Sequence, residues 1–416
     1  MIRGRAARLA PWLLGAGLAI NFGAGAASAT AHQPIHAPAE EQLIDALQYW
    51  HSGHYGTALH ELGALVDVHP DFRLAQFLYG EALLGRAGNA RAIRSLEAGE
   101  QGRRSALIDE ARLRWRHYRH APPAGAVPNA VLLLAPRYLY VIAVDLEHNR
   151  LYLFTNQNKS LRLIADFYAS VGAAGGGKQF EGDLRTPVGI YHVTGFKPDR
   201  TLPELYGDGA FPLNYPNAWD QFFGRTGDGI WLHGVPRTTY NRPPRASEGC
   251  VVLSNRDLRV LGSYIRPGTT PVVLSNHLDW VSRQDTQLAR HDFLRRLQAW
   301  QQSWEQVAST AYLGFYAENF VSVQGQSKYE FSRFARTVSL GDTQRMALRL
   351  DDVSVFQYPG EPHLMLVSFT RRVGEEQTGT GIRQYWRKSP QAGWQIVLEK
   401  RFQPTTVAAN VLFGDR

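Results

Sequence analysis

Residues 40–120 carry apolar side chains at intervals of three and four, and few β-branched runs interrupt them. This spacing places the apolar residues on one face of a helix, so the segment is predicted to be α-helical. The same spacing returns after residue 281, where one apolar stripe is formed by Leu294, Leu297, Trp300, Trp304 and Val307. Two helical segments, far apart in the chain, are therefore expected.

The first helical segment contains a short repeat. Its stretch GHYGTALHELGALVDVHPDF is similar to a tetratricopeptide repeat at Gly53, Tyr55, Ala58, Leu62 and Pro70. Ala58 and Leu62 recur 34 residues later as Ala92 and Leu96. The resemblance implies a tetratricopeptide-like module at 40–120 that contacts other envelope proteins. The alternative is an ordinary antiparallel helical hairpin.

Between the two helical segments the pattern is that of short strands. The runs Tyr138–Asp145 and Arg150–Thr155 flank a polar turn and predict a β-hairpin, and the Pro-rich segment 122–130 before them is predicted to be a hinge. Further pieces separated by Gly, Pro, Asn or Asp predict a sandwich or barrel. These pieces are LRLIADFYASVG, GIYHVTGF, DGIWLHGV, GCVVLSN and TPVVLSN.

Four more strand candidates follow the second helical segment. They are rich in Val, Phe, Tyr and Trp and lie near 345–357, 362–372, 379–388 and 393–402. A helix followed by such a meander is similar to the cone-shaped fold of the nuclear-transport-factor-2-like group. This resemblance implies a C-terminal α+β domain at 285–405, whose aromatic side chains either fill the core or line a cavity.

The first 29 residues have the pattern of an export signal. Three arginines precede the apolar stretch Leu9–Phe22, and the small residues Ala27–Ala29 follow it. We therefore predict a signal peptide at 1–29 and an exported protein, and the combination of modules favours the periplasm. The alternative is an uncleaved membrane anchor, which the short, proline-interrupted stretch disfavours.

The composition narrows the classes of binding partner that are expected. The formal net charge is +8, with Lys and Arg spread along the chain and no basic block of the kind that binds nucleic acid. An anionic surface such as cell-wall glycopeptide fits this balance, and nucleic acid is not an expected partner. Cys250 is the only cysteine. A single thiol in an exported protein is intermolecular, buried and inert, or reactive.

A base for this thiol lies 17 residues earlier. His233 stands in the strand-like IWLHGVP, and the Pro-rich loop after it can bring the strand that starts at Cys250 alongside. A thiol attacks as thiolate, so an imidazole within hydrogen-bond reach is required. No Asp or Asn adjoins the histidine, so the carbonyl of Gly234 or of the nearby loop is expected to fix its tautomer.

Two ordered motifs resemble one family. His233-Gly234, a loop and then SEGC are similar to the catalytic signature of the L,D-transpeptidase catalytic domain, the YkuD family. VGAAGGGKQFEGDLRTPVGIYHV is similar to that family's Gly-rich turn and TPxGxY strand. The matching positions are Gly172, Gly177, Lys178, Thr186, Pro187, Gly189 and Tyr191. The resemblance covers residues 137–276 and implies a multidomain α+β protein with a mostly-β catalytic domain.

The resemblance also implies a reaction. A cysteine attacks the meso-diaminopimelyl carbonyl of a peptidoglycan stem tetrapeptide, D-alanine leaves, and an amine takes the acyl group. Carried over, Cys250 is the nucleophile, His233 is the base, and Gly234 supports that histidine. The signature turn, oxyanion donors and substrate contacts then fall to Ser247, Gly249, Cys250 and Arg245. Neither a metal nor an organic cofactor is implied.

Two positions depart from the family pattern. Glu248 replaces the usual histidine before Gly-Cys, and Val252 replaces an arginine two residues after the cysteine. A carboxylate near the thiol raises the pKa of the thiol unless it turns outward or pairs with Arg245 or Arg242. The arginine that is missing is expected to bind a carboxylate, and Arg245, Arg256 or Arg259 is expected to take that role.

Other side chains are weaker candidates. His192 is predicted to be an ordinary strand residue. Trp219, Phe222 and Phe223 are expected either to cover the cleft or to lie in the core, and substrate contacts are assigned to Tyr215, Asn217 and Arg237. For function, transfer to an amine is the first hypothesis. The alternatives are transfer to water, as in an L,D-carboxypeptidase or endopeptidase, and a catalytically weak wall-binding scaffold.

Overall fold

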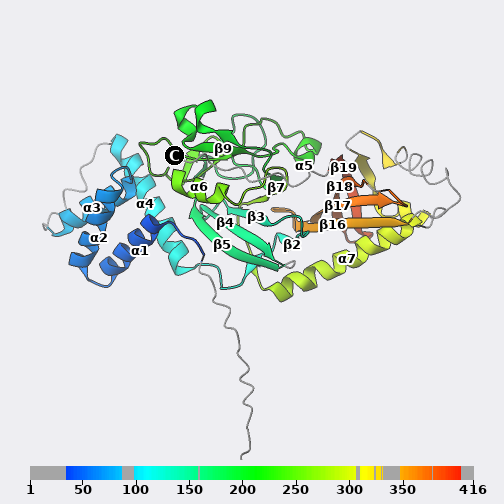
Figure 1. Cartoon of the computed structure of the whole chain (residues 1–416), viewed down its shortest axis with the longest axis horizontal. Coiled ribbons are helices and arrows are strands. Elements are labelled where there is room, and N and C mark those ends of the chain that lie inside the picture. The colour runs from blue at the N-terminus through cyan, green and yellow to red at the C-terminus, as the bar shows by residue number, and fades with distance from the viewer. Residues whose placement is uncertain are drawn as a thin grey trace, which may run out of the picture. The chain divides into compact units, whose positions relative to one another are not determined.

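Within a computed structural model, four helices are followed by a β-rich region, then by a long helix and a second large sheet (Figure 1). This order agrees with the predicted mostly-β domain between two flanking modules. The predicted signal peptide, 1–29, lies outside the described residues. No helix in the described part of the chain is long and apolar enough to cross a bilayer. The structure describes residues 34–86, 98–157, 160–305, 310–322, 325–328, 330, 347–376 and 378–403.

The helical module consists of α1 (Pro38–His51), α2 (Tyr55–Val68), α3 (Arg73–Arg86) and α4 (Ala98–Arg119). Helix α1 begins with a proline in its first turn, followed by Glu40 and Glu41, which the exposed N–H groups of a helix start favour. The helices share a core that includes Leu43, Leu62 and Phe72. The predicted helical character of this segment is confirmed.

The positions assigned to a repeat differ in their surroundings. Ala58 and Leu62 are buried in the helical core, as the assignment requires, whereas 58% of Tyr55 is exposed. Gly53 has a φ of +82° in the turn between α1 and α2. The counterparts Ala92 and Leu96 lie outside the described residues. The assignment to tetratricopeptide repeats therefore stays a prediction.

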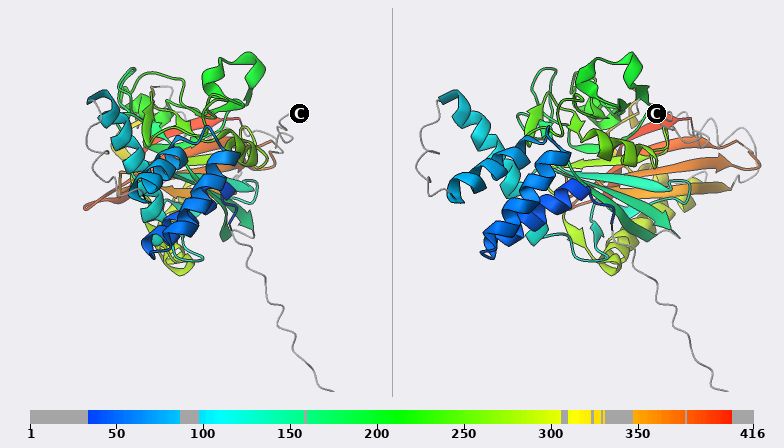
Figure 2. Two further views of the ribbon diagram at one scale, coloured as in Figure 1. Left: turned by 90° about the vertical axis from the view of Figure 1, so that its left-hand side faces the viewer. Right: turned by 60° about the vertical axis from the view of Figure 1, so that its left-hand side comes forward.

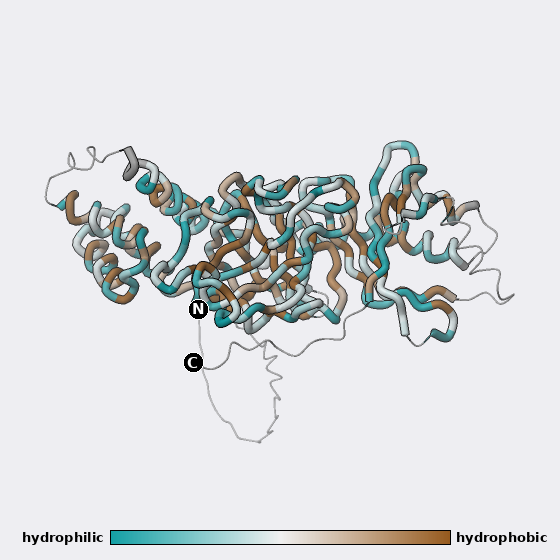
Figure 3. Tube along the Cα trace, turned by 90° about the horizontal axis from the view of Figure 1, so that it is seen from above, coloured by the Kyte–Doolittle hydropathy of each residue, from teal (hydrophilic) through white to brown (hydrophobic). Residues whose placement is uncertain are grey.

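The central region is built on a five-stranded sheet, in the order β5-β4-β3-β13-β7. The expected hairpin is present as the antiparallel pair β3 and β4, and β13 pairs with β3 in parallel. Hydrophobic residues are concentrated inside the β-rich part of the chain (Figure 3). The strands are β3 (Tyr140–Asp145), β4 (Arg150–Gln157), β5 (Ser160–Tyr168), β7 (Gly189–His192) and β13 (Pro271–Ser275).

A second, smaller sheet has the order β12-β10-β9-β8, and β6 pairs separately with β11. These short strands and the helices beside them surround the two motifs of the sequence. Their bounds are β6 (Val171–Gly172), β8 (Lys197–Pro198), β9 (Gly209–Pro212), β10 (Trp231–His233), β11 (Arg245–Ser247), β12 (Val251–Val252), α5 (Ala218–Phe222), α6 (Asn255–Gly262) and the 3₁₀ turns η2 (Asp199–Thr201) and η3 (Glu204–Tyr206).

The C-terminal domain is built on a six-stranded sheet, in the order β15-β19-β18-β17-β16-β2, whose last strand, β2 (Val131–Leu133), comes from before the central region. Helix α7 runs along one face of this sheet (Figures 1 and 2), where Phe293, Leu297 and Trp300 join Trp386 in a shared core. The four predicted strands are present within a few residues of their expected bounds. The elements are α7 (Arg283–Glu305), α8 (Thr310–Leu313), β15 (Tyr316–Ser322), β16 (Leu348–Gln357), β17 (Leu364–Val373), β18 (Thr380–Ser389) and β19 (Gly393–Phe402).

The predicted hinge at 122–130 is wrong in its second half. Residues 127 and 128 form β1 (Val127–Pro128), which pairs with β14 (Trp280–Val281). The next residues form β2 (Val131–Leu133), which pairs with β16 of the C-terminal sheet. Pro128 is tolerated in β1 because β1 and β14 form a two-stranded sheet, in which each strand is an edge. The segment therefore contributes strands rather than a free joint.

Candidate active site

Strands β10 and β12 bring the two ends of the candidate site together. They pair in parallel, with Leu232 opposite Val251 and His233 opposite Val252. Alternate residues of a strand point to the same face, so His233 and the residue just before β12, Cys250, lie on the same side of this pair. The loop between the motifs thus returns the chain as the sequence predicts.

The imidazole of His233 is fixed by its neighbour. Its Nδ1 lies 2.7 Å from the carbonyl oxygen of Gly234. A carbonyl only accepts, so Nδ1 donates and Nε2 is left as an unprotonated base. Burial lowers the pKa of His233 to about 4, although the Gly234 carbonyl opposes that change. The ring is therefore neutral at neutral pH.

Gly234 leaves no room for a side chain, because a Cβ there would overlap the side-chain oxygen of Asn255. That oxygen accepts from the backbone N–H groups of Val235 and Asp208, each at 3.1 Å. The Asn255 amide also donates to the carbonyl oxygen of Val235 at 2.8 Å. Asn255 thus holds the turn that supports His233, a role that no motif indicated.

The thiol of Cys250 is held in its protonated form. Burial around the sulfur raises the pKa of Cys250 to about 11, while the backbone N–H of Trp231 and the charge of Arg242 act in the opposite direction. Sγ lies 3.3 Å from the carbonyl oxygen of Gly229, to which the thiol donates. The thiol and the imidazole are both uncharged in the resting protein.

The turn before the thiol is built by Ser247 and Gly249. The Ser247 hydroxyl donates to the carbonyl oxygen of Cys250 at 2.6 Å and accepts from the N–H of Gly249 at 3.2 Å. Gly249 has a φ of +131°, and a Cβ there would lie 2.6 Å from the carbonyl oxygen of Arg185. Only glycine fits this position.

The backbone amides of Gly249 and Cys250, which are predicted to face an oxyanion, differ in their hydrogen-bond partners. That of Gly249 is directed at Ser247, so it is occupied in this structure. The amide of Cys250 makes no hydrogen bond to any residue that the structure describes. The Cys250 N–H is thus the donor that can receive a developing negative charge.

The arginines near the signature have separate surroundings. Arg245 is exposed on β11, Arg256 pairs with Asp257 at 3.1 Å, and Arg259 pairs with Asp208. Arg242 is the arginine whose charge acts on the thiol, and it opposes the rise in the pKa of Cys250. The structure thus points to Arg242 as the arginine whose charge acts on the thiol, and the prediction that Arg245, Arg256 or Arg259 binds a carboxylate stays a prediction.

Glu248 turns outward. Its side chain is exposed, and its negative charge acts on both Cys250 and Arg242. The guanidinium of Arg242 donates to the carbonyl oxygens of Leu205 and Ala246, at 3.2 and 3.4 Å. As predicted, the charge of Glu248 raises the pKa of the thiol, but burial raises that pKa more.

Tyr206 is a site residue that the sequence did not indicate. Its ring meets the imidazole of His233 edge-on at 4.9 Å and lies 5.0 Å from the ring of Trp231. Burial raises the pKa of Tyr206, and the charges of Cys250 and Glu248 add to that rise. Tyr206 ends a 3₁₀ turn that lies 27 residues before His233, so no local spacing connects the two.

The aromatic residues of α5 do not all face the site. Trp219 is fully buried, stacks on Tyr385 at 5.2 Å, and donates from Nε1 to Glu361 at 2.8 Å. Trp219 is therefore a core residue against the C-terminal sheet, whereas Phe222 and Phe223 are 38% and 50% exposed.

The other residues assigned to substrate have structural partners. Asn217 caps the start of α5, and the Tyr215 hydroxyl donates to the carbonyl oxygen of Thr226 at 3.0 Å. Arg237 pairs with Asp199 at 2.8 Å. His192 ends β7, as predicted, and burial lowers its pKa to about 3. None of these contacts points to a substrate.

The loop between His233 and Cys250 rests on the helical module. Tyr240 stacks on Phe72 with ring centres 4.3 Å apart, and its N–H donates to the carbonyl oxygen of Asp71 at 3.3 Å. The amide of Asn241 donates to Glu110 at 2.7 Å. The residue next along the loop is Arg242. The helical module therefore anchors the segment that carries this cation.

A buried ion-pair network joins the same two parts. Glu40 of α1 accepts from Arg114 of α4 at 2.7 Å and from Arg150 of β4 at 2.8 Å. Arg150 also pairs with Asp166 of β5 at 2.6 Å. Burial raises the pKa of Glu40, but the charges of Arg150 and Arg114 outweigh it and lower that pKa to about 2.

Comparisons with known proteins agree with this geometry. Residues 139–274 match the family model described as the L,D-transpeptidase catalytic domain, YkuD, and residues 292–400 match the Cds6 C-terminal NTF2-like domain. The chain thus carries a YkuD-type domain followed by an NTF2-like domain, as the two resemblances implied. No curated protein sequence matches the chain significantly.

Two solved structures are similar over most of their length. Bd1075 of Bdellovibrio bacteriovorus is 28% identical with a TM-score of 0.59, covering 68% of this chain and 99% of that one. Pgp2 of Campylobacter jejuni, described as a helical cell shape determining protein, is 21% identical with a TM-score of 0.55, covering 65% of this chain and 95% of that one. The second likeness concerns the fold alone.

Proposed function

We propose that the protein is an exported L,D-transpeptidase in which Cys250 attacks the meso-diaminopimelyl carbonyl of a peptidoglycan stem tetrapeptide. The observation that carries this proposal is the parallel pairing of β10 with β12. It sets Cys250 beside the strand of His233, whose Nε2 is left as the base. The region that matches the family, 139–274, includes both residues.

Acylation begins from the neutral pair. Nε2 of His233 takes the thiol proton as the sulfur of Cys250 bonds to the carbonyl carbon, and the carbonyl π electrons move to oxygen. The Cys250 N–H donates to this oxyanion. When the intermediate collapses, the C–N bond to D-alanine breaks, the leaving amine takes the proton from His233, and a thioester remains.

Deacylation reverses these roles. An acceptor amine attacks the thioester carbon, His233 takes a proton from that amine, and the C–S bond breaks. The sulfur of Cys250 then recovers the proton. An amine of a second stem peptide gives a 3–3 cross-link, and an amine of a protein attaches that protein to the wall. Water in the same position makes the enzyme an L,D-carboxypeptidase or endopeptidase.

The electrostatics of the site support transfer chemistry despite the altered signature. The family's arginine after the cysteine is replaced by Val252, and Arg242 supplies a positive charge at the thiol instead. Glu248 is exposed, so its carboxylate leaves the thiol accessible. These features favour a working enzyme over a catalytically weak scaffold.

The setting of the reaction is also part of the proposal. The Arg-rich start, the apolar stretch and the small residues after it support export, and the combination of modules supports the periplasm. Stem peptides are the proposed substrates. The helical module is proposed to contact other envelope proteins, including one that becomes attached to the wall.

The deciding experiment incubates the purified protein with tetrapeptide muropeptides and separates the products by mass. Cross-linked dimers together with released D-alanine are expected. Tripeptides as the sole product would assign the water-dependent reaction instead. Cys250→Ser is the matched control and should yield neither product.

A second measurement separates enzyme from scaffold. A carbapenem should acylate the reduced, folded protein once, with the added mass located on Cys250, because its strained ring carries an acyl carbon of the same kind. The Cys250→Ser variant should gain no mass. Absence of the adduct from the parent protein would favour the scaffold.

A further inference from the structure

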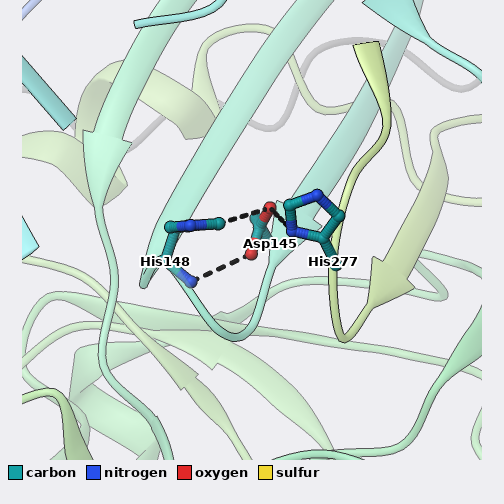
Figure 4. Close-up of side chains that lie close together, drawn as sticks. All are labelled: Asp145, His148 and His277. Atoms are coloured by element: carbon teal, nitrogen blue, oxygen red, sulfur yellow. Dashed lines mark hydrogen bonds and ion pairs between the residues drawn. The ribbon is translucent and has the colours of Figure 1, made fainter. Parts of the chain in front are cut away.

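Three side chains that the proposed reaction does not use converge at one end of the five-stranded sheet (Figure 4). Asp145 ends β3, His148 stands in the turn to β4, and His277 lies two residues after β13, the parallel neighbour of β3. Each offers one ligand atom, and these atoms all lie within 4.8 Å of one another. Two imidazoles and a carboxylate thus meet at one point.

The distances suit a small cation. One carboxylate oxygen of Asp145 lies 3.0 Å from Nδ1 of His148 and 3.8 Å from Nδ1 of His277. Two ligand atoms bound to one zinc ion at about 2.1 Å are themselves about 3 to 4 Å apart. Both distances from the carboxylate fall in this range.

The carboxylate is held in place before any ion binds. Asp145 is buried, and its two oxygens accept from the backbone N–H groups of His148 and Leu278, each at 2.9 Å. The hydroxyl of Ser275 donates to the carbonyl oxygen of His277 at 2.5 Å, which orders the second arm. Outer hydrogen bonds of this kind orient metal ligands.

Two further carboxylates stand at the rim. Glu147 and Asp279 each have an oxygen 3.8 Å from a ring nitrogen of His277, and both side chains are exposed. Three carboxylates around two imidazoles give this corner a negative charge, in a chain whose net charge is +8. A cation relieves that charge, and its coordination can be completed by water or by Glu147, whose oxygen lies near the same Nδ1 of His277.

We propose that Asp145, His148 and His277 form a binding site for a divalent cation of the zinc class. Nitrogen ligands favour zinc over magnesium or calcium, which prefer oxygen alone. The ion would join the β3–β4 turn to residues 276–282, which lead through β14 into α7. Its effect is on stability, because none of these groups belongs to the thiol and imidazole pair.

The test uses the full chain carrying Cys250→Ser, so that the only thiol does not compete for the metal. Calorimetric titration with Zn²⁺ should show one equivalent bound, and unfolding midpoints should rise with Zn²⁺. His148→Ala and His277→Ala should each weaken binding at least tenfold and remove that rise. Both histidines are partly exposed, with side-chain exposures of 31% and 53%, so these variants should fold.

His291→Ala is the matched control, since this histidine is exposed on α7. It should bind Zn²⁺ as the parent does. Binding that is absent from the parent, or unchanged in both histidine variants, would overturn the proposal and leave an ion pair between Asp145 and His148. Co²⁺ provides an independent reading, because its visible absorption should report nitrogen and oxygen ligands and should disappear in the same two variants.

Discussion

The pKa of the Cys250 thiol lies above that of the His233 imidazole, so both groups are neutral at rest. Burial raises the pKa of the thiol to about 11 and lowers that of the imidazole to about 4. A resting thiolate and imidazolium would require the opposite order. In the proposed reaction the sulfur becomes a nucleophile only during attack, when its proton passes to Nε2, and the protonated thiol reacts more slowly with oxidants until then.

This order predicts the ionisation of the thiol. At pH 8 a free cysteine is about one quarter thiolate, whereas Cys250, with its raised pKa, should be almost entirely protonated. The ultraviolet absorbance of thiolate, taken as the difference between the parent and Cys250→Ser, should appear only as pH approaches 11.

The same order predicts the pH dependence of acylation. The reactive neutral pair persists between the two pKa values, so carbapenem acylation should be nearly constant from pH 5 to 9 and decrease as His233 is protonated near pH 4. In His233→Gln only free thiolate reacts, and the rate should rise about tenfold per pH unit. A flat profile in that variant would contradict the assigned base.

Gly249 offers a steric prediction. Alanine there meets both an unfavourable φ and the carbonyl oxygen of Arg185, so the turn must shift and the sulfur with it. We expect Gly249→Ala to slow carbapenem acylation at least tenfold. Gly195→Ala, at a glycine with open space around it, should react like the parent. Equal rates for the two variants would show that the turn tolerates a side chain.

Motifs in the sequence indicated the residues that we propose to perform the chemistry, and the geometry added residues that support them. Each of these residues is next to a glycine in the sequence. Gly234 supplies the carbonyl that fixes His233, and Gly249 allows the turn before Cys250. Tyr206 contacts His233 from a 3₁₀ turn, and Asn255, at the start of α6, holds the turn after His233, so only the fold brings both residues to the site. Arg242 had been named only as a partner of Glu248, because its distance from the thiol depends on the path of the loop.

At the scale of elements, the loop from 234 to 249 connects two strands and also rests on another module. Tyr240 stacks on Phe72, and the neighbouring Asn241 makes a partly buried contact with Glu110. Arg242 precedes β11, which pairs with β6, so these side chains help to position Arg242 before the backbone pairing begins. Its position depends on residues more than 100 positions earlier.

A pair of substitutions at Tyr240 tests this dependence. The Tyr240 hydroxyl is buried and has no partner among the described residues, so Tyr240→Phe should leave stability and acylation unchanged. Tyr240→Ala removes the stacked ring, and carbapenem acylation should slow several-fold as Arg242 moves away from the thiol. If both variants acylate at the parent rate, the loop keeps its position without the helical module.

Helices and strands were predicted most accurately where the pattern of apolar and polar residues was clearest. The β3–β4 hairpin and the strands β16 to β19 were predicted within a few residues because each alternates clearly and ends at a turn. The segment 131–133 lies before both predicted domains, and no prediction placed it in the C-terminal sheet. It pairs with β16, and an apolar run carries no information about which sheet edge it joins.

At the scale of the whole molecule, buried charges hold the helical module to the catalytic domain. Removing one charge from a buried network costs about 3 kcal/mol, because the charges that faced it lose part of their compensation. Glu40 connects α1, α4 and β4, so its loss should weaken the contact between the two parts, while Arg150 keeps its pair with Asp166 and Arg114 keeps its pair with Glu110. Such long-range pairs have no signature in the sequence.

Glu40→Gln should lower the free energy of unfolding at pH 7 by about 3 kcal/mol. The pKa of Glu40 is lowered on folding, from 4.5 to about 2, so its contribution is present above pH 4.5 and is lost as pH falls towards 2. Urea unfolding should therefore show a smaller difference between variant and parent at pH 3. Glu41→Gln, next in sequence and exposed, should match the parent at both pH values.

One thiol in 416 residues gives this protein a built-in probe. A reagent that modifies cysteine reports on a single atom, with no need to remove competing sulfurs. The rate of that modification should depend on the charge of Arg242, which lowers the pKa of the thiol and is carried by a loop resting on the helical module. The rate of cysteine labelling can therefore report how the helical module docks on the loop. A partner that binds the helical module should change the labelling rate of Cys250.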